Sequence, residues 1–285
     1  MMSFITDIQQ YEFLQNALIT SIMVGIICGV IGSFIIMRGM ALMGDAISHA
    51  ILPGVAISYM LGINYFYGAV LFGIITALGI GIVSQNSRIK SDSAIGIVFT
   101  AFFALGVILI SKAQTATDLT QILFGNVLSV RQSDMIMTLI IGVIVLLVVI
   151  LLYKELLIST FDETMAAAYG LPTKWIHYGI MVLLTLATVA SLQTVGVVLV
   201  VALLITPAST AYLLTNKFST MIILSAFFGA LSSVIGLYVS SEYNLESGAV
   251  IVIAATCMFG LAFIFSPKHG VLWRSLRTQK SKANV

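Results

Sequence analysis

Long apolar segments that follow one another with almost no charge constrain this chain more than any other feature. A helix needs about 20 consecutive apolar residues to cross a membrane. Nine segments approach that length: residues 14–36, 41–61, 65–85, 93–111, 134–153, 175–192, 195–215, 218–239 and 247–266. They lack the strict alternation of apolar and polar residues that is typical of membrane β-barrels. The segments therefore predict an all-α polytopic membrane protein, a bundle of eight or nine transmembrane helices.

Composition excludes a soluble globular fold of this size. Hydrophobic residues make up 60% of the 285 residues and charged residues 8%, against roughly 45–50% and about 25% in ordinary soluble domains. So few charges could not cover the surface of a soluble globule. The turn at residues 193–196 between two of the spans is very short, and a partly re-entrant hairpin there would reduce the count from nine to eight.

Lys and Arg residues are distributed unevenly over the connections between the spans. With the N-terminus outside and the C-terminus in the cytoplasm, Lys112 and Arg131 are the two of the 13 basic residues that fall on the outer side. Cytoplasmic connections carry the excess of Lys and Arg in membrane proteins, so this orientation is expected. It divides the chain into an extracellular segment 1–13, a transmembrane domain 14–266 and a basic cytoplasmic tail 267–285.

Small residues recur at four-residue spacing in the first two spans. Gly25 and Gly29 form one such pair, and a longer stripe follows in the second span: Ala46, Ala50, Gly54 and Ser58. Small residues allow close contact between helices in lipid. They could serve packing within this chain or across a dimer axis, and the sequence leaves both arrangements open.

Two ionisable residues, Asp45 and His49, stand within the second span. At a rise of 1.5 Å per residue they lie roughly 8 Å and 13 Å from the inner face, and their i, i+4 spacing places them on one helix face. An ionised Asp inside the membrane costs at least about 2.5–3.5 kcal/mol, so a compensating role is expected. A carboxylate with an imidazole suits Mn²⁺, Fe²⁺ or Zn²⁺. Two ligands are too few for a metal, but a symmetric dimer would supply up to four.

Two other interpretations of this pair remain open. Asp45 and His49 could form an internal hydrogen bond, with Ser48 nearby, that only supports packing. They could also carry protons, because His titrates near neutral pH and intramembrane carboxylates often belong to proton relays. Pro53, just beyond the pair, removes a backbone hydrogen bond and favours a kink there.

A short cytoplasmic helix is predicted at about residues 160–170. Thr160 and Glu163 have the spacing of a capping box, and Gly170 is placed to end the helix. A partner protein could bind this helix, or the helix could lie on the lipid surface. The residues assigned to the docking surface for a partner are Thr160, Phe161, Asp162, Glu163, Met165, Ala166, Tyr169 and Gly170.

Acidic residues also occur in the predicted outer connections. Glu242 and Glu246 precede the last span and could attract cations at an outer mouth, although a solvated loop is the simpler interpretation. Asp118, in the outer segment 112–133, has the same two interpretations. His177 begins a span beside a Lys and a Trp, which is typical of the membrane interface.

Four motifs give the chain a resemblance to a known family: GDAISHAILPG at 44–54, SDSAIG at 91–96, QTVG at 193–196 and LITPA at 204–208. With these motifs the chain resembles the membrane permease subunit of a manganese/zinc/iron ABC importer, and it is most similar to the manganese-importing branch of Gram-positive bacteria. The resemblance covers nearly the whole chain. Permeases of this family are usually described with about eight spans.

The resemblance implies a multi-pass protein of the bacterial plasma membrane. Asp45 and His49 would lie on the path of the transported metal, and residues 160–172 would be the coupling helix that docks into a groove on an ATPase. The implied partners are a second copy of the chain, two cytoplasmic ATPase subunits and an extracellular metal-binding lipoprotein. The metal would be cargo, with no cofactor bound permanently.

Other function classes can be weighed against this one. The chain contains no Gly followed directly by Lys, so it lacks a P-loop and ATP would have to be used by a partner. A zinc or iron importer of the same family remains an alternative, as does a proton-coupled secondary transporter, although no internal repeat is evident. With three histidines, His49, His177 and His269, an intramembrane metalloprotease is not expected, and nothing predicts a nucleic-acid partner.

Overall fold

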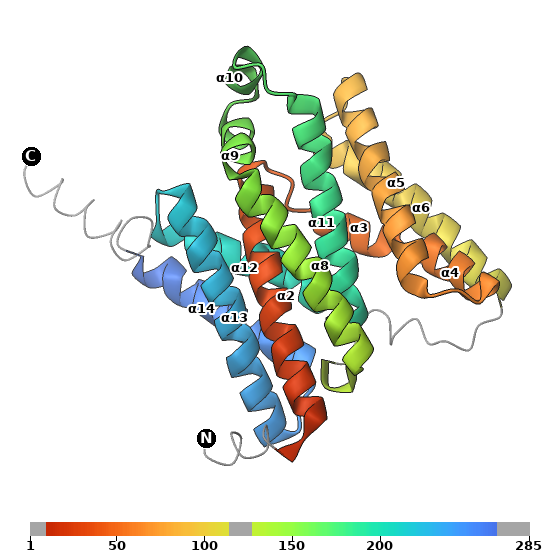
Figure 1. Cartoon of the computed structure of the whole chain (residues 1–285), viewed down its shortest axis with the longest axis vertical. Coiled ribbons are helices and arrows are strands. Elements are labelled where there is room, and N and C mark those ends of the chain that lie inside the picture. The colour runs from red at the N-terminus through yellow and green to blue at the C-terminus, as the bar shows by residue number, and fades with distance from the viewer. Residues whose placement is uncertain (1–9, 114–126, 267–285) are drawn as a thin grey trace, which may run out of the picture.

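The computed structural model describes residues 10–113 and 127–266. Those residues form helices and connecting turns, with no β-strand among them (Figure 1). The helices are α2 (Glu12–Met37), α3 (Met43–Ala50), α4 (Leu52–Leu61), α5 (Tyr65–Asn86), α6 (Ser91–Ala113), η1 (Val127–Ser129), α8 (Gln132–Leu151), α9 (Tyr153–Phe161), α10 (Glu163–Ala168), α11 (Thr173–Val195), α12 (Val197–Leu214), α13 (Phe218–Tyr243) and α14 (Ser247–Phe265). The predicted all-α architecture is confirmed.

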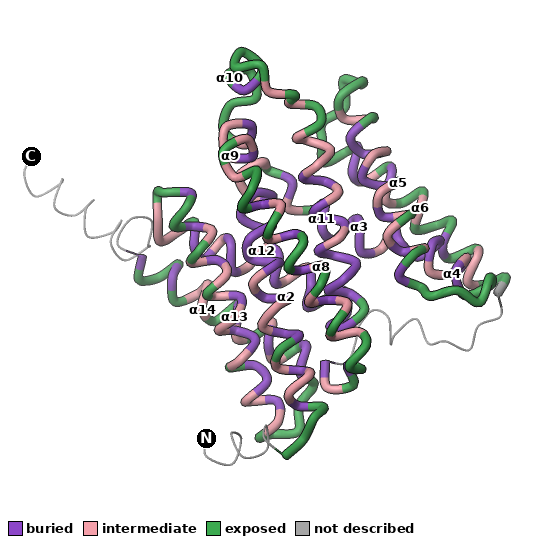
Figure 2. The backbone as a smooth tube through the Cα atoms, in the orientation of Figure 1, coloured by how far each residue is buried: buried purple, intermediate pink, exposed green. Residues whose placement is uncertain are grey.

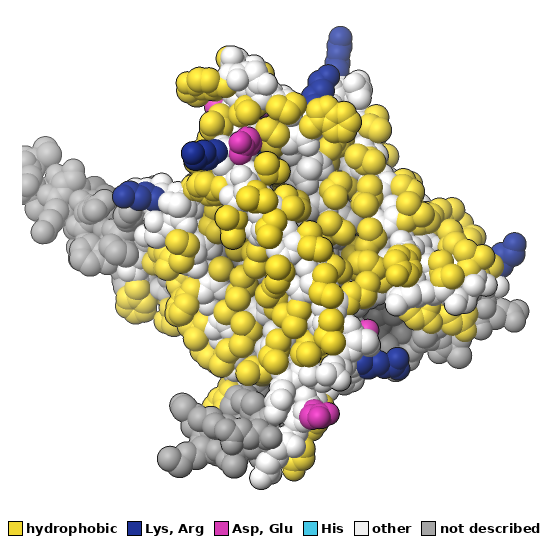
Figure 3. Space-filling view, viewed as in Figure 1, with side chains coloured by type: hydrophobic (Ala, Val, Ile, Leu, Met, Phe, Trp, Pro, Cys, Tyr) yellow, Lys and Arg dark blue, Asp and Glu magenta, His cyan; other side chains and the backbone are white. Residues whose placement is uncertain are grey.

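Eight helices in the described part of the chain are long and apolar enough to cross a membrane, namely α2, α5, α6, α8, α11, α12, α13 and α14. Hydrophobic side chains cover the face of the bundle in Figure 3, and charged side chains gather toward its ends. Such a surface matches lipid on the sides and water at the ends. The predicted multi-pass membrane protein is therefore confirmed.

Each of those eight helices matches one predicted span to within a few residues, whereas the predicted span 41–61 is divided. Its residues form α3 and α4, which meet at Ile51. The short turn near residue 196 is a single residue, Gly196, whose φ of 83° favours glycine and lets α12 start directly after α11. The long helices thus number eight, and the divided pair supplies the remaining apolar segment.

Helix α2 is the most buried of the long helices, and it packs against α13, α12, α8 and α11 (Figure 2). Its glycines explain the contact with α13. A Cβ added to Gly25 would overlap the backbone of Gly229, and one added to Gly29 would overlap the backbone of Ser225. Close backbone approach of this kind is the use that lipid-embedded helices make of small residues. The Gly25 and Gly29 pair therefore packs within the chain.

The second small-residue stripe also packs inside the chain. Ala46 and Ala50 are buried on α3. A Cβ on Gly54 would overlap the backbone of Gly68, so α4 and α5 approach as closely there as α2 and α13 do. Ser58 is buried one turn further on. These contacts anchor α3 and α4 to the bundle.

The bundle has two distinct ends. Helix α10 and the connection between α5 and α6 lie at the upper end of Figure 1, while the start of α2 and the connection between α13 and α14 lie at the lower end. Helix α3 lies between the two ends, toward the interior of the bundle. A residue on α3 therefore lies at an intermediate depth between the two ends of the bundle.

Candidate functional site

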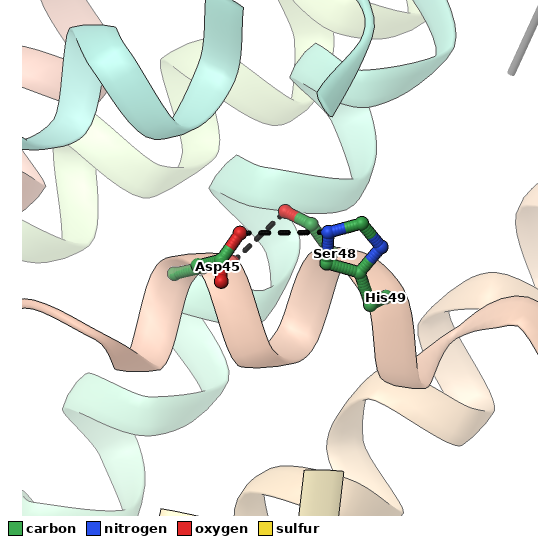
Figure 4. A network of polar contacts seen from close by, with 4 residues as sticks. Asp45, Ser48 and His49 are labelled. Atoms are coloured by element: carbon green, nitrogen blue, oxygen red, sulfur yellow. Dashed lines mark hydrogen bonds and ion pairs between the residues drawn. The ribbon is translucent and has the colours of Figure 1, made fainter. Parts of the chain in front are cut away.

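Helix α3 presents Asp45 and His49 together (Figure 4). The Nε2 atom of His49 lies 3.5 Å from Oδ1 of Asp45, as expected for residues one helical turn apart. The hydroxyl of Ser48, beside the pair, donates a 2.8 Å hydrogen bond to the carbonyl of Gly44. A contact between Asp45 and His49 is common to the packing interpretation and to the metal interpretation of the pair.

The break between α3 and α4 lies next to His49. In a continuous helix the residue at position 53 would donate its N–H to the carbonyl of His49, but Pro53 has no N–H. The chain is interrupted at Ile51 instead, and Pro53 occupies the first turn of α4, where proline is well tolerated. The predicted kink is confirmed, and it leaves α3 as an eight-residue helix. Asp45 stands in its first turn, where the helix dipole stabilises a carboxylate.

Two aromatic side chains of α6 hold the ring of His49. The ring centroids of Phe99 and Phe103 lie 5.9 Å and 5.8 Å from that of His49, and Phe103 meets the imidazole edge to face. The Nδ1 atom of His49 is buried and makes no hydrogen bond. This leaves Nε2, which faces Asp45, as the nitrogen for an external ligand. Nothing in the sequence linked Phe99 and Phe103 to His49, since contacts between helices follow no short-range pattern.

The pair remains partly open. The side chains of His49 and Asp45 are 24% and 47% exposed, respectively. No group of three or more His, Cys, Asp or Glu side chains that could hold a metal occurs within residues 10–113 and 127–266. A single described chain therefore offers one carboxylate and one imidazole, which can hold a divalent ion only together with ligands from elsewhere.

At the upper end, the segment predicted as one helix at residues 160–170 is divided in two. Helix α9 ends at Phe161 and α10 is a separate helix of six residues. The N-cap of α10 is Asp162, whose Oδ1 accepts the backbone N–H of Met165 at 2.8 Å. The expected cap at Thr160 is wrong, because the hydroxyl of Thr160 donates to the carbonyl of Leu156 inside α9.

Other features of that segment follow the prediction. Gly170 has a φ of 77°, and the N–H of Leu171 bonds to the carbonyl of Ala166, which closes α10 with a Schellman motif. Hydrogen bonds from the Thr164 hydroxyl and the Met165 N–H lower the pKa of Asp162. In this segment the exposed side chains are Phe161, Asp162, Glu163, Met165 and Tyr169, Thr160 is partly buried and Ala166 is buried.

The acidic residues of the predicted outer mouth lie together at the other end. Glu242 is exposed in the last turn of α13, and Glu246 is exposed just before α14. The connection between α13 and α14 that they flank is at the lower end in Figure 1, away from α10. They are therefore not brought to the Asp45 and His49 pair. Asp118 falls outside the described residues.

Comparison with known proteins places these features in a family. The model of the ABC 3 transport family matches residues 10–266. The chain belongs to the ABC 3 transport family. The manganese transport system membrane protein MntC of Listeria monocytogenes is 65% identical over 97% of this chain and 99% of its own length. The manganese import system permease protein ScaB of Streptococcus parasanguinis is 52% identical over 93% and 95%.

A solved structure supports the same conclusion for the fold. The structure titled PsaBC from Streptococcus pneumoniae in complex with Fab contains a chain with a TM-score of 0.87 and 50% identity, covering 98% of this chain and all of that one. The resemblance seen in the sequence is thus confirmed. As a member of the ABC 3 family, the chain is a membrane subunit of a transport system and not an enzyme.

Proposed function

We propose that this chain is the permease of an ATP-driven manganese importer, in which the metal passes between Asp45 and His49 of two copies. The observation that carries the proposal is the Asp45 and His49 pair on α3. It is a carboxylate and an imidazole 3.5 Å apart on a helix that lies between the two ends of an apolar bundle, and that helix is interrupted beside the pair. Ionisable groups at membrane depth mark substrate and ion pathways.

A second copy of the chain completes the site. Asp45 is 47% exposed, and an exposed carboxylate at this depth would otherwise face lipid at a cost of at least about 2.5–3.5 kcal/mol. A two-fold axis beside α3 brings two Asp45 and two His49 side chains together and supplies up to four ligands. A site shared by two copies requires each copy to supply only part of the metal ligands, and one chain supplies two.

Manganese is the preferred cargo because the relatives named above are called manganese transport and manganese import proteins. Carboxylate and imidazole ligands are compatible with Mn²⁺, and they would also accept Zn²⁺ or Fe²⁺. The ligand set alone therefore leaves zinc and iron as alternatives, which a competition experiment separates.

ATP is hydrolysed by two cytoplasmic partner subunits that dock on α10 and its flanks. Phe161, Met165 and Tyr169 are exposed there and offer an apolar contact. With α10 on the cytoplasmic side of the bacterial plasma membrane, the N-terminus lies outside and the C-terminus lies in the cytoplasm. It also places Glu242 and Glu246 at the outer mouth, where an extracellular metal-binding lipoprotein delivers the ion.

The test is accumulation of radioactive Mn²⁺ in cells that carry the permease with its ATPase and binding protein. Asp45→Ala at matched membrane abundance should reduce uptake by more than about tenfold, since even outer partners of metal ligands contribute 10- to 100-fold. Asp92→Ala is the matched control, because Asp92 is exposed at the start of α6 and should be neutral. Normal uptake by Asp45→Ala would refute the site.

Two further arms separate the alternative functions. Excess Zn²⁺ or Fe²⁺ that replaces Mn²⁺ in the wild type would change the cargo and leave the permease function intact. Uptake that persists with an ATPase partner unable to hydrolyse ATP, and that follows the proton gradient, would favour the proton-coupled secondary transporter. The proposal predicts that uptake stops when the ATPase is inactive.

A further inference from the structure

The C-terminal end of α2 holds a partly buried cluster of polar side chains that the metal site does not use. Arg38 follows the last residue of α2, and each of its three guanidinium nitrogens contacts a different side chain. Its Nη2 donates to the hydroxyl of Ser159 at 2.8 Å, its Nε donates to Thr160 at 3.3 Å, and its Nη1 lies 3.2 Å from Nδ1 of His177. Arg38 thus joins the end of α2 to the last turn of α9 and to the start of α11.

The environment of Arg38 explains how a cation is held there by neutral partners. Arg38 is the C-cap of α2, and its partners Ser159 and Thr160 belong to the last turn of α9, so the guanidinium lies at the C-terminal ends of two helices. The negative end of a helix dipole stabilises a cation. Burial lowers the pKa of Arg38, and the carboxylate of Glu163 in α10 opposes that shift.

Arg38 stands immediately before the segment that positions the candidate metal ligand. Gly39, with a φ of 67°, turns the chain, and α3 begins at Met43 with Asp45 in its first turn. Six residues lie between Arg38 and Asp45. A displacement of α9 and α10 that moved Arg38 would consequently reach α3 through a short connection.

An aromatic contact runs parallel to this polar one. The ring of Phe161, at the end of α9, lies 5.5 Å from that of Phe218 at the start of α13. Phe218 in turn lies 5.0 Å from the ring of Phe34, in the last turns of α2. The end of α9 is thus packed against α2 both directly and through α13.

We propose that Arg38 is a positioning residue that transmits motion of α9 and α10 to α3, and so couples ATP hydrolysis by the partner to release of the metal. The proposal rests on the proposed function. It requires the planar guanidinium, because a lysine has one nitrogen and cannot reach three acceptors on two helices. Removing the link should leave the metal ligands in place while ATP is hydrolysed without transport.

The experiment measures Mn²⁺ transported per ATP hydrolysed by the complete complex in proteoliposomes. It also measures Mn²⁺ binding to the permease by electron paramagnetic resonance. Arg38→Gln should lower the transport ratio by at least about tenfold, the factor that corresponds to one charge-assisted hydrogen bond. Mn²⁺ binding should stay within about twofold, and Arg38→Lys should restore the ratio only in part. Lys217→Gln is the control, because Lys217 is an exposed cation at the start of α13.

Ser159→Ala keeps the arginine and removes one hydroxyl, so it answers the question even where Arg38→Gln fails to assemble. It should lower the ratio by a few-fold, and its effect should vanish in the Arg38→Gln background, since both remove the same link. A wild-type ratio in Ser159→Ala and Arg38→Gln would overturn the inference and leave the proposed function standing. A wild-type complex that moves no Mn²⁺ would overturn both.

Discussion

Two regions of the bundle differ in how their polar groups are arranged: the contact between α2 and α13, and the break between α3 and α4. In the first, Gly25 and Gly29 bring two backbones together, and the hydroxyl of Ser225 bonds to the carbonyl of Gly29 at 2.7 Å. In the second, Asp45 is half exposed and Nδ1 of His49 has no hydrogen-bond partner. The first region is closed and satisfied, whereas the second is open.

This difference separates structure from function in the bundle. Polar groups buried in an apolar interior are normally paired, because each unpaired group costs free energy. The serines of the α2–α13 contact follow that rule and therefore stabilise packing. Asp45 and His49 contact each other at 3.5 Å but stay partly exposed, which is what a transport site needs if the two side chains are to reach an ion. The contrast predicts that substitutions in the first region affect folding and those in the second affect transport.

The largest expected effect is on folding. Gly25→Leu would force a side chain into the backbone of Gly229, and α2 and α13 would have to separate. Overpacking of a tight contact costs about 1–3 kcal/mol or more. The folded fraction after detergent extraction should fall sharply. Gly96→Leu is the control, because a Cβ at Gly96 would meet no atom within 4 Å apart from its own stretch of helix. Equal behaviour of the two variants would break the comparison.

Asp45→Asn should separate stability from transport. Removing an intramembrane charge relieves an insertion cost of about 2.5–3.5 kcal/mol, so the thermal midpoint of the purified permease should stay the same or rise. Mn²⁺ uptake should nevertheless fall by more than about tenfold. A lowered midpoint with normal uptake would make Asp45 a packing residue like Ser225, and the comparison would fail.

A smaller effect is expected from Pro53→Ala. The variant restores the N–H that bonds to the carbonyl of His49 in a continuous helix, so α3 and α4 should join and His49 should turn. Uptake should fall by a few-fold with less than about 1 kcal/mol change in stability, since Pro53 stands in a helix first turn. Slow exchange of the amide introduced at position 53 would report the joined helix, with Pro207→Ala in α12 as control.

The smallest effect concerns the cap of α10. Because the pKa of Asp162 is lowered in the folded state, its cap stabilises α10 fully above the ordinary Asp pKa, near 3.9. That contribution is lost as pH falls through the lowered pKa. Asp162→Ala should speed exchange of the Met165 amide by a few-fold near neutral pH, whereas Asp162→Asn keeps an acceptor and should not. Unchanged exchange in the alanine variant would argue against the cap.

The spans were predictable because apolar length alone decides whether a segment crosses the membrane. Eight long helices follow the predicted segments closely. The only sequence signal for the division of the second span was Pro53. Whether a proline bends or interrupts a helix depends on the packing around it. The partners of Gly25 and Gly29 could not be derived, since a stripe of small residues fits a helix of the same chain and one of another chain equally well.

The Asp45 and His49 pair was also predictable. An Asp and a His one turn apart in an apolar span cost free energy in the membrane, so a functional role is expected for them. The groups around the pair were not. Phe99 and Phe103 come from another helix, and no sequence pattern links Arg38 to α9 or α11. Local sequence placed the cap of α10 at Thr160, whereas a bond to Leu156 retains Thr160 in α9 and leaves the cap to Asp162.

The most direct measurement is the nitrogen hyperfine spectrum of Mn²⁺ bound to the purified permease with its ATPase. The wild type should show coupling to histidine nitrogen, and His49→Gln should lose it. His177→Gln should keep it, because Nδ1 of His177 is engaged by Arg38. A nitrogen signal that survives in His49→Gln would contradict the metal site on α3 and the account built on it.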